Sequence, residues 1–374
     1  MISVVLILNI GSSSIKWSTF NSLTDVDVLA EGRETIDNMS TCVAGLLHDL
    51  EPSLCIIRFV HGGTKMIKPR EVTLRTVKSL DDLVEFAPIH NRLAVDCIRL
   101  ILSSDNNMRI IAVFDTEFFQ NLPRVARMYG LPQYLIQKHG IRRFGFHGFA
   151  HASMLNILDE IAAKSFDTAF RYSRVITIQL GSGCSMAAIR NGIPIETSMG
   201  FSPNEGLLMS SRCGDIDASL VTWLQKKESW TPEETDRILN EQSGWKGFSG
   251  LSGDMRQLLE SDSDSAKCAI DLFVYRIKKT IGAYYALLGG LDAVAFGGGI
   301  SEHAPELCRR IMDKSGHLGV VLLSEVGSGS GSSSAPPIQL TQDDSNVACW
   351  VVMEDEAKMM MQTVFHSGIA REIM

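Results

Sequence analysis

The sequence lacks the features that mark three large classes of protein. It has no apolar run near the ~20 residues that a membrane-spanning helix needs. Its longest, residues 1–10, has no basic segment before it, so we interpret it as a buried strand. None of its 8 cysteines stands in a Cys-x-x-Cys pair, which disfavours a zinc site or a disulfide framework. There is no basic excess, because 43 acidic residues outnumber 35 basic ones. We therefore expect a cytoplasmic protein that binds neither nucleic acid nor a membrane surface.

What remains is an ordinary globular composition. Of the 374 residues, 45% are hydrophobic and 21% are charged, which excludes wholesale disorder and collagen-like repeats. At roughly 100–200 residues per domain, this length corresponds to two domains more comfortably than to one. The net charge of −8 means that any anionic ligand must be met by cations placed locally.

A strand, a glycine turn and a returning strand occur twice along the chain. The first copy occupies residues 4–8, 11–14 and 15–20, and the second occupies residues 175–180, 181–183 and 186–189. Two halves that open in the same way indicate a duplicated α/β fold with a cleft between the halves.

The other expected elements follow from ordinary sequence signals. We expect strands at 54–60, 109–114, 293–296 and 347–352, one helix after Thr231, one that ends at Gly289-Gly290, one that begins at Pro305, and a terminal helix. The glycine and serine run at 327–334 predicts a flexible surface loop. The strands at 54–60 and 109–114 deliver His61 and Asp115 at their carboxyl ends, where open α/β sheets usually bind ligands.

Three glycine-rich turns are candidate phosphate sites. Residues 9–16 read Asn-Ile-Gly-Ser-Ser-Ser-Ile-Lys, which combines backbone N–H groups, hydroxyls and a cation. The same residues also suit an ordinary hairpin turn. The turn at 181–183 and the loop at 297–302 would let backbone approach a nucleotide closely, and each also suits a plain loop.

Two arginines and one histidine are the candidate catalytic side chains. Arg58 leaves an apolar strand and Arg212 lies in a Ser-Arg-Cys-Gly-Asp segment. A guanidinium at the edge of buried surface needs an anionic partner, and two at one pocket would bind a carboxylate or a phosphoryl group. The alternative is a structural ion pair, for example Arg212 with Asp215. His147, among aromatic residues and glycines, is either a catalytic donor or a buried core residue.

Taken together, these segments resemble the acetokinase family, which comprises acetate, propionate and butyrate kinases. The resemblance runs from residue 8 to about residue 364 and rests on several ordered blocks. They are Asn-x-Gly-Ser-Ser-Ser-x-Lys at 9–16, Val-His-Gly-Gly at 60–63, Ala-Pro-Ile-His-Asn at 87–91, Val-Phe-Asp-Thr at 113–116, Gly-Phe-His-Gly at 145–148, the segments 197–207 and 212–217, and Tyr-Arg-Ile-Lys-Lys at 275–279.

The resemblance implies a fold and a reaction. The fold is α/β, with two ribonuclease-H-like domains of the acetate/sugar kinase and actin superfamily and an active-site cleft between the domains. Residues 1–119 would form the N-terminal domain, on which a terminal helix at 357–374 packs, and residues 120–356 the nucleotide-binding and dimerisation domain. The implied enzyme is a homodimeric phosphotransferase with a carboxyl group as acceptor. It would transfer the ATP γ-phosphoryl group reversibly to acetate with Mg²⁺ or Mn²⁺, giving acetyl phosphate and ADP.

By resemblance, the site residues fall into four groups. The catalytic residues are Arg58, Asp115, His147 and Arg212; the arginines hold the carboxylate and the transferring phosphoryl group, and His147 donates to an equatorial oxygen. The acetate site is formed by Arg58, Val60, Ile89, Phe146 and Pro203. The nucleotide is bound by Ser14, Lys16, Gln179, Gly181, Ser182, Gly183, Asp254, Met255, Arg256, Gly299 and Ile300, and the metal ion by Asn9 and Glu356. Valine rather than alanine at position 60 favours acetate over propionate by a partial margin.

Several segments depart from the family's pattern. The family's His-Leu-Gly-Asn-Gly is Gln-Leu-Gly-Ser-Gly at 179–183, its Gly-Ile-Gly-Glu-Asn is Gly-Ile-Ser-Glu-His at 299–303, and its Pro-Thr-Asn-Glu-Glu is Met-Glu-Asp-Glu-Ala at 353–357. The donor side therefore differs more than the acceptor side. Three alternatives stay open: a preference for propionate or butyrate, a different donor such as pyrophosphate, and a weakly catalytic paralogue that binds nucleotide.

Overall fold

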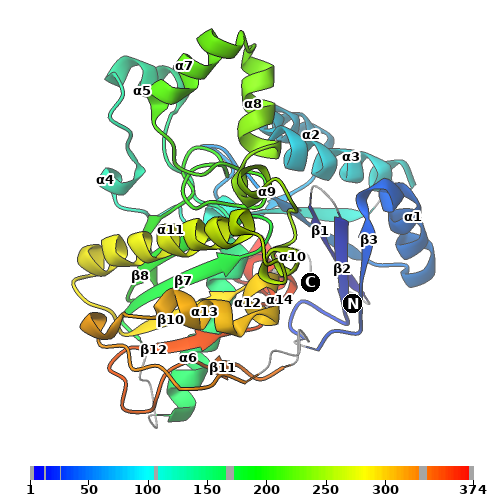
Figure 1. Cartoon of the computed structure of the whole chain (residues 1–374). Coiled ribbons are helices and arrows are strands. Elements are labelled where there is room, and N and C mark those ends of the chain that lie inside the picture. Colours follow the sequence, from blue (N-terminus) through cyan, green and yellow to red (C-terminus); the bar gives the residue numbers. More distant parts are fainter. Residues whose placement is uncertain are drawn as a thin grey trace. The chain divides into compact units, whose positions relative to one another are not determined.

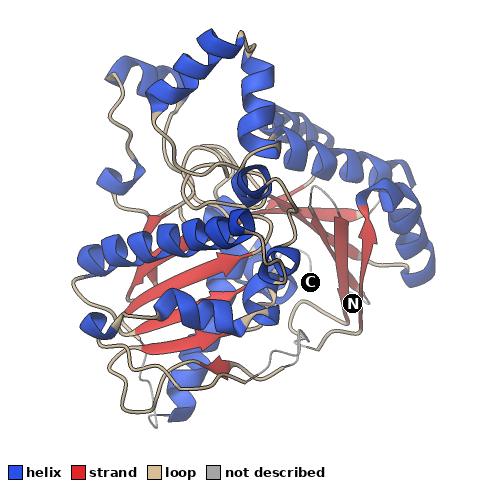
Figure 2. Cartoon of the chain, viewed as in Figure 1, coloured by secondary structure: helices blue, strands red, loops and turns tan. Residues whose placement is uncertain are grey.

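The computed structural model describes residues 4–11, 14–25, 27–104, 108–165, 172–327 and 335–369. The chain divides into two compact units, whose elements are labelled in Figure 1 and coloured by type in Figure 2. Unit 1 comprises Met1–Gln120, Phe146–Phe149 and Asp355–Met374, and unit 2 comprises Asn121–Gly145 and Ala150–Glu354. Within the described ranges, no helix combines the length and the apolar character that crossing a bilayer requires.

Unit 1 is built on a sheet with the strand order β3-β2-β1-β4-β6-β5. The strands are β1 (Val5–Ile10), β2 (Ser14–Phe20), β3 (Ala30–Thr35), β4 (Leu54–Phe59), β5 (Arg70–Glu71) and β6 (Arg109–Phe114). Strands β1, β2 and β3 form an antiparallel meander, β1, β4 and β6 are parallel, and β5 is an antiparallel edge. The helices are η1 (Ile36–Asn38), α1 (Met39–Leu50), α2 (Leu74–Asp81), η2 (Asp82–Phe86), α3 (Pro88–Ser104), η3 (Asp115–Glu117) and α14 (Glu356–His366).

Both faces of the unit 1 sheet are covered, which explains why its parallel strands are apolar throughout. Side chains alternate between faces along a strand. Leu6 and Leu8 of β1 therefore join a core cluster with residues of α1 and α3, whereas Val5 and Ile7 join a second cluster with Met360, Met361 and Val364 of α14. Helix α14 thus seals one face of the sheet by contacts with β1, β4 and β6.

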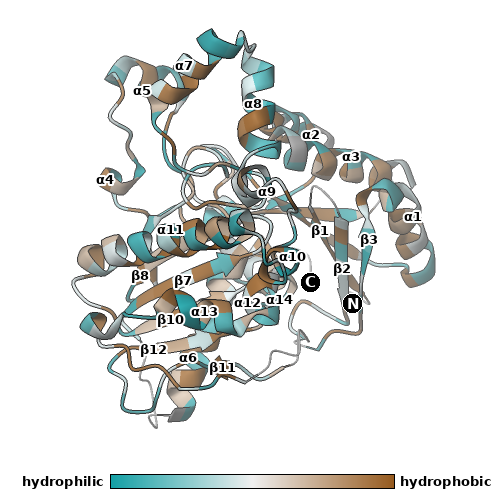
Figure 3. Ribbon diagram, viewed as in Figure 1, coloured by the Kyte–Doolittle hydropathy of each residue, from teal (hydrophilic) through white to brown (hydrophobic). Residues whose placement is uncertain are grey.

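Unit 2 repeats this sheet. Its order is β11-β12-β10-β7-β8-β9, where β7 (Arg174–Leu180), β8 (Cys184–Arg190) and β9 (Ile193–Thr197) form the antiparallel meander. Strands β7, β10 (Ala293–Gly297) and β12 (Ala348–Val351) are parallel, and β11 (Ile338–Gln339) is the antiparallel edge. In Figure 3 the central strands of this sheet are largely coloured as hydrophobic.

The helices of unit 2 follow their capping signals. They are α4 (Arg124–Arg127), α5 (Gln133–His139), α6 (Gly148–Ser165, whose first two residues belong to unit 1), α7 (Ala218–Glu228), α8 (Pro232–Glu241), α9 (Gly244–Ser249), α10 (Met255–Leu259), α11 (Asp264–Leu288), α12 (Gly299–His303), α13 (Pro305–Met312) and η4 (Gly316–Leu318). Thr231 and Glu234 form a capping box at the start of α8. Helix α11 ends at Gly289, whose φ of 71° is the left-handed conformation that glycine adopts without strain.

The predicted fold class is confirmed. The two sheets share one topology, as the duplicated strand, turn and strand pattern predicts, and it is the ribonuclease-H-like order that the family resemblance implies. The strand predicted at 109–114 is β6 to the residue. The strand predicted at 54–60 is one residue longer than β4 at its carboxyl end, and the strand predicted at 347–352 is one residue longer than β12 at each end. Residues 12 and 13 of the first glycine turn, 328–334 of the glycine and serine loop, and 370–374 of the terminal helix lie outside the described residues.

Candidate active site

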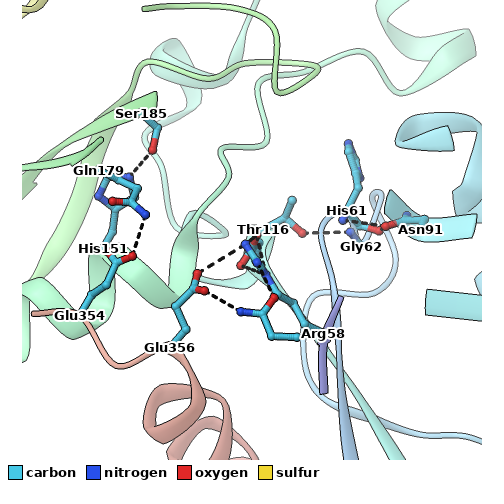
Figure 4. A network of polar contacts seen from close by, with 12 residues as sticks. Arg58, His61, Gly62, Asn91, Thr116, His151, Gln179, Ser185, Glu354 and Glu356 are labelled. Carbon is cyan, nitrogen blue, oxygen red and sulfur yellow. Dashed lines mark hydrogen bonds and ion pairs between the residues drawn. The ribbon is translucent and has the colours of Figure 1, made fainter. Parts of the chain in front are cut away.

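Four of the predicted site residues meet at the carboxyl edge of the unit 1 sheet. Asn9 lies near the end of β1, Arg58 near the end of β4, Asp115 directly after β6, and Glu356 at the first position of α14. Because β1, β4 and β6 are parallel neighbours, their carboxyl ends share one edge. Figure 4 shows Arg58 and Glu356 facing each other at this edge. The topology thus assembles the cluster from residues that are up to 347 positions apart.

Arg58 is the centre of this cluster. Its Nη2 lies 2.5 Å from Asp115 Oδ2, and its Nε donates to Asp115 Oδ1 at 3.1 Å. Its Nη1 donates to Asn9 Oδ1 at 2.7 Å, and Nη2 lies 3.6 Å from Glu356 Oε1. Asn9 Nδ2 in turn donates to Glu356 Oε2 at 2.6 Å. One guanidinium between two carboxylates leaves the cluster with a formal excess of negative charge.

Asp115 is buried and held by several groups. Burial raises the pKa of its carboxyl to about 6, while the charge and hydrogen bonds of Arg58 oppose that rise. The backbone N–H of His147 also donates to this carboxylate and lowers its pKa. A Cβ on Gly148 would lie 2.0 Å from the Asp115 carbonyl oxygen, so only glycine fits there. The Phe146–Phe149 segment, in which His147 has a φ of 57°, is therefore packed closely against the turn that carries Asp115.

The residues predicted to bind acetate fall into both units. Val60 follows β4 and is buried, and Phe146, which belongs to the same unit, is fully buried. Ile89 lies in the first turn of α3. Pro203 belongs to unit 2, where its carbonyl accepts a hydrogen bond from Arg212 Nη1 at 3.1 Å.

Arg212 has no carboxylate partner among the described residues. Its other contact is a long one, from Nη1 to Met209 Sδ at 3.7 Å. The alternative of an Arg212–Asp215 ion pair is wrong, because Asp215 Oδ1 accepts from the Gly206 backbone instead. Burial lowers the pKa of Arg212 from its usual value, which is the cost of holding a cation away from water without an anion.

The predicted nucleotide loops of unit 2 share one sheet edge. Gly181, Ser182 and Gly183 follow β7, and Gly298 and Gly299 follow its parallel neighbour β10. A Cβ on Gly298 would lie 2.5 Å from the Leu180 carbonyl oxygen, so the loop after β10 lies against the end of β7 with no room for a side chain. Gln179 Nε2 donates to Glu354 Oε1 at 2.7 Å (Figure 4). The structure thus joins two of the departures from the family's pattern, at positions 179 and 354, by a hydrogen bond.

The remaining nucleotide candidates are spread over both units. Asp254 caps α10 by accepting from the Arg256 backbone, and its ion pair with the exposed Arg256 side chain lowers the pKa of Asp254. Met255 is buried in the same turn, and Ile300 is half-buried in α12. In unit 1, Ser14 Oγ accepts from Arg33 Nε at 3.2 Å, and Lys16 is exposed on β2.

A charged network that sequence reasoning missed fixes the loop that carries Pro203. Arg143 forms an ion pair with Glu205 and donates to the Thr197 carbonyl at 2.7 Å. Tyr129 donates its hydroxyl proton to Glu205 and accepts from the Phe201 backbone at 2.7 Å. Burial and Glu205 raise the pKa of Tyr129. Glu205 stood in a block that carried the resemblance, but nothing in the sequence indicated its partners.

The unit 1 cluster suits a divalent cation. Mg²⁺ usually keeps most of its waters and takes one or two protein oxygens. Glu356 and Asn9 present oxygens beside the excess negative charge described above, so these residues fit such an ion. No group of three or more histidine, cysteine, aspartate or glutamate side chains that would form a protein-only metal cage occurs in the described part of the chain.

Comparisons with known proteins show the family and the fold. A sequence model of the acetokinase family matches residues 39–362. The acetate kinase of Halothermothrix orenii is 35% identical over 391 residues, covering 94% of this chain and 96% of that protein. The crystal structure of Porphyromonas gingivalis acetate kinase superposes with a TM-score of 0.83 at 29% identity, covering 98% of this chain and 99% of that one. A propionate kinase from Francisella tularensis gives the same TM-score at 28% identity, covering 96% and 98%.

Proposed function

The chain belongs to the acetokinase family, and from that premise we propose that it is an acetate kinase. It would transfer the γ-phosphoryl group of ATP reversibly to acetate, giving acetyl phosphate and ADP. The observation that carries this proposal is the cluster of Asn9, Arg58, Asp115 and Glu356 at one sheet edge. It is joined by the guanidinium of Arg212, which forms no ion pair within the described ranges. A carboxylate is a weak nucleophile, so catalysis of its phosphorylation rests on positioning and on charge neutralisation.

We assign the roles from the charges of these groups. Arg58 is already held by Asp115, which fixes its guanidinium in one orientation for the acetate carboxylate. Arg212 lacks an anion among the described residues and would neutralise the transferring phosphoryl group. His147 would donate to an equatorial oxygen. Mg²⁺, held through Glu356 and Asn9, would supply charge neutralisation at the phosphates.

The experiment that tests the proposal is trapping of acyl phosphate with hydroxylamine. We expect hydroxamate from acetate, ATP and Mg²⁺, less from propionate and butyrate because Val60 restricts the acyl pocket, and none with pyrophosphate as the donor. Mn²⁺ should substitute for Mg²⁺, and EDTA should stop the reaction. Turnover with pyrophosphate but not ATP would replace the proposed donor. The absence of hydroxamate with every pair, despite ADP binding, would favour the nucleotide-binding paralogue.

Substitutions at Gln179, which contacts Glu354, distinguish an active kinase from the nucleotide-binding paralogue. An imidazole at position 179 would still donate to Glu354, so we expect Gln179→His to change kcat by less than about threefold. Gln179→Leu removes a hydrogen bond to a charged group, worth roughly 1.5–3 kcal/mol, and should raise the KM for ATP about tenfold. Steady-state kinetics with varied ATP measure both. A rise in turnover of about a hundredfold in Gln179→His, from a low starting rate, would indicate that the wild-type glutamine had impaired catalysis.

We also propose a cytoplasmic homodimer. All eight cysteines are free thiols, which suits a reducing compartment. We propose residues 1–119 with 357–374 as the N-terminal domain and residues 120–356 as the nucleotide-binding and dimerisation domain. Light scattering coupled to size-exclusion chromatography should give twice the chain mass of 41.1 kDa, and a mass of one chain would contradict the dimer.

A further inference from the structure

Three aromatic rings stack behind the carboxyl end of β4 in unit 1. The centroid of the His61 ring lies 4.9 Å from that of Phe86 at an interplanar angle of 25°. It lies 5.3 Å from that of Phe146 at 60°. His61 and Phe146 are both completely buried, whereas Phe86, at the end of η2, is half-buried. Phe86 is therefore the most exposed of the three rings, and Phe146, which contacts the same imidazole, is a residue assigned to the acyl pocket.

The backbone of His61 is clamped by Asn91 and its neighbour by Thr116. Asn91 is fully buried; its Oδ1 accepts from the His61 N–H at 3.3 Å, and its Nδ2 donates to the His61 carbonyl at 3.0 Å and to the Leu83 carbonyl at 2.9 Å. The Gly62 N–H donates to Thr116 Oγ1 at 3.1 Å. One amide side chain thus ties the end of β4 to η2, the element that carries Phe86.

The imidazole of His61 is fixed as well. Its Nδ1 accepts from the Gly63 N–H at 2.8 Å, so Nδ1 carries a lone pair and the proton of the neutral ring lies on Nε2. Gly63 has a φ of 61°, and a Cβ there would lie 2.8 Å from the Leu83 side chain. The hydrogen bond from the Gly63 N–H sets the orientation of the imidazole relative to the backbone. The oriented His61 ring therefore contacts both Phe86 and Phe146.

We propose that this stack of Phe86, His61 and Phe146 sets the depth of the acyl pocket, so that Phe86 decides how well a three-carbon acid is accepted relative to acetate. The inference rests on the proposed function. Two residues assigned to the acyl pocket adjoin this stack: Val60 immediately precedes His61 in the chain, and the Phe146 ring contacts the His61 ring. Because interiors are packed without spare volume, Phe146 can yield to an extra methylene only if the rings behind it can also yield. Phe86 is a positioning residue, since it acts through His61.

The direct test is Phe86→Leu, assayed with acetate and propionate. A single methylene in a hydrophobic pocket typically changes kcat/KM by about 10- to 200-fold. A leucine in place of the Phe86 ring would reduce part of this discrimination against propionate. We expect the propionate to acetate ratio of kcat/KM to rise about fivefold or more, mainly through the KM for propionate. The KM for ATP should stay within about twofold, which a general loosening of the fold would not allow.

Phe365→Leu is the matched control. Phe365 packs against the adjacent His366 ring at 5.5 Å near the end of α14 in the same unit, and it is 39% exposed. Its contact with histidine is edge to face, at an interplanar angle of 69°, and lies at a position to which no site role is assigned. We expect this variant to keep the wild-type ratio. Phe86→Met, which fills more of the ring's volume, provides a second variant if Phe86→Leu does not fold.

The outcomes are distinguishable. An unchanged ratio in Phe86→Leu, or in Phe86→Met where that variant replaces it, with an active wild type would overturn the inference and leave the proposed function intact. An equal rise in Phe365→Leu would overturn it too, because the effect would then be unspecific. A wild type that forms no acyl phosphate from either acid would overturn the proposed function and the inference together.

Discussion

Arg212→Ala should abolish acyl phosphate formation while leaving the protein as stable as the wild type. Arg212 donates only to the Pro203 carbonyl and to a methionine sulfur, and it has no carboxylate partner in the described part of the chain. Burial lowers its pKa, so the folded protein gains nothing from its charge until an anion binds. If that anion is the phosphoryl group in transit, removal of the guanidinium should reduce kcat about a thousandfold or more.

The same argument sets the controls for Arg212. Arg212→Lys keeps a charge but loses the planar fork, so it should recover only a small part of the activity. Arg174→Ala is the matched control in unit 2, because Arg174 is ion-paired with Asp292 and half exposed; it should cost at most about 1 kcal/mol of stability and leave turnover unchanged. Urea unfolding and hydroxamate formation measure the two quantities. If Arg212→Ala kept a tenth of the wild-type turnover, the assigned role would be wrong.

The sequence predicted the sheets well for a physical reason. Strands β4, β6, β7 and β10 are buried on both faces, so each is a nearly continuous apolar run bounded by polar or glycine residues. Such runs are visible without knowledge of their partners. The parallel order then places their carboxyl ends together, which is why Asp115 could be singled out as the residue that follows an apolar strand.

The contacts that organise the site were not predictable in this way. Asn9 and Glu356 are 347 positions apart and Gln179 and Glu354 are 175 apart, and no local pattern relates them. In the sequence, Asn91 was only the last residue of the Ala-Pro-Ile-His-Asn block. In the structure, its side-chain amide donates to the His61 carbonyl just after β4. Periodicity and turn signals report local energetics, whereas these pairs depend on where two chain segments meet after folding.

Whether each of the two arginines binds substrate or forms a structural ion pair could be decided only from its partners in the structure. From the sequence, each was either a substrate ligand or half of an ion pair. The structure gives a different answer for each residue, because Arg58 is paired with Asp115 and Arg212 is not paired with Asp215. A paired arginine contributes to folding and to binding at once, so the two roles must be separated by experiment.

Arg58→Met should therefore remove both activity and stability. The side chains of Arg58 and Asp115 are 10% and 0% exposed, and removal of one partner leaves a carboxylate buried without its cation. Breaking such a pair typically costs about 3–5 kcal/mol of unfolding free energy. We expect a loss of this size by urea unfolding above neutral pH, together with loss of hydroxamate formation. Without Arg58 the pKa of Asp115 rises further, so the loss should shrink as the pH falls and the buried carboxyl takes up a proton.

The double variant Arg58→Met/Asp115→Leu distinguishes the two contributions. With both charges replaced by apolar groups, no buried charge of the pair is left uncompensated, so most of the stability lost in the single variant should return. Activity should not return, because acetate would still lack its guanidinium. A double variant as unstable as Arg58→Met would show that Arg58 stabilises unit 1 mainly through Asn9 and Glu356, its other two partners. A single variant within about 1 kcal/mol of the wild type would show that the Arg58–Asp115 pair contributes little net stability, so that its position at the sheet edge is explained by substrate binding alone.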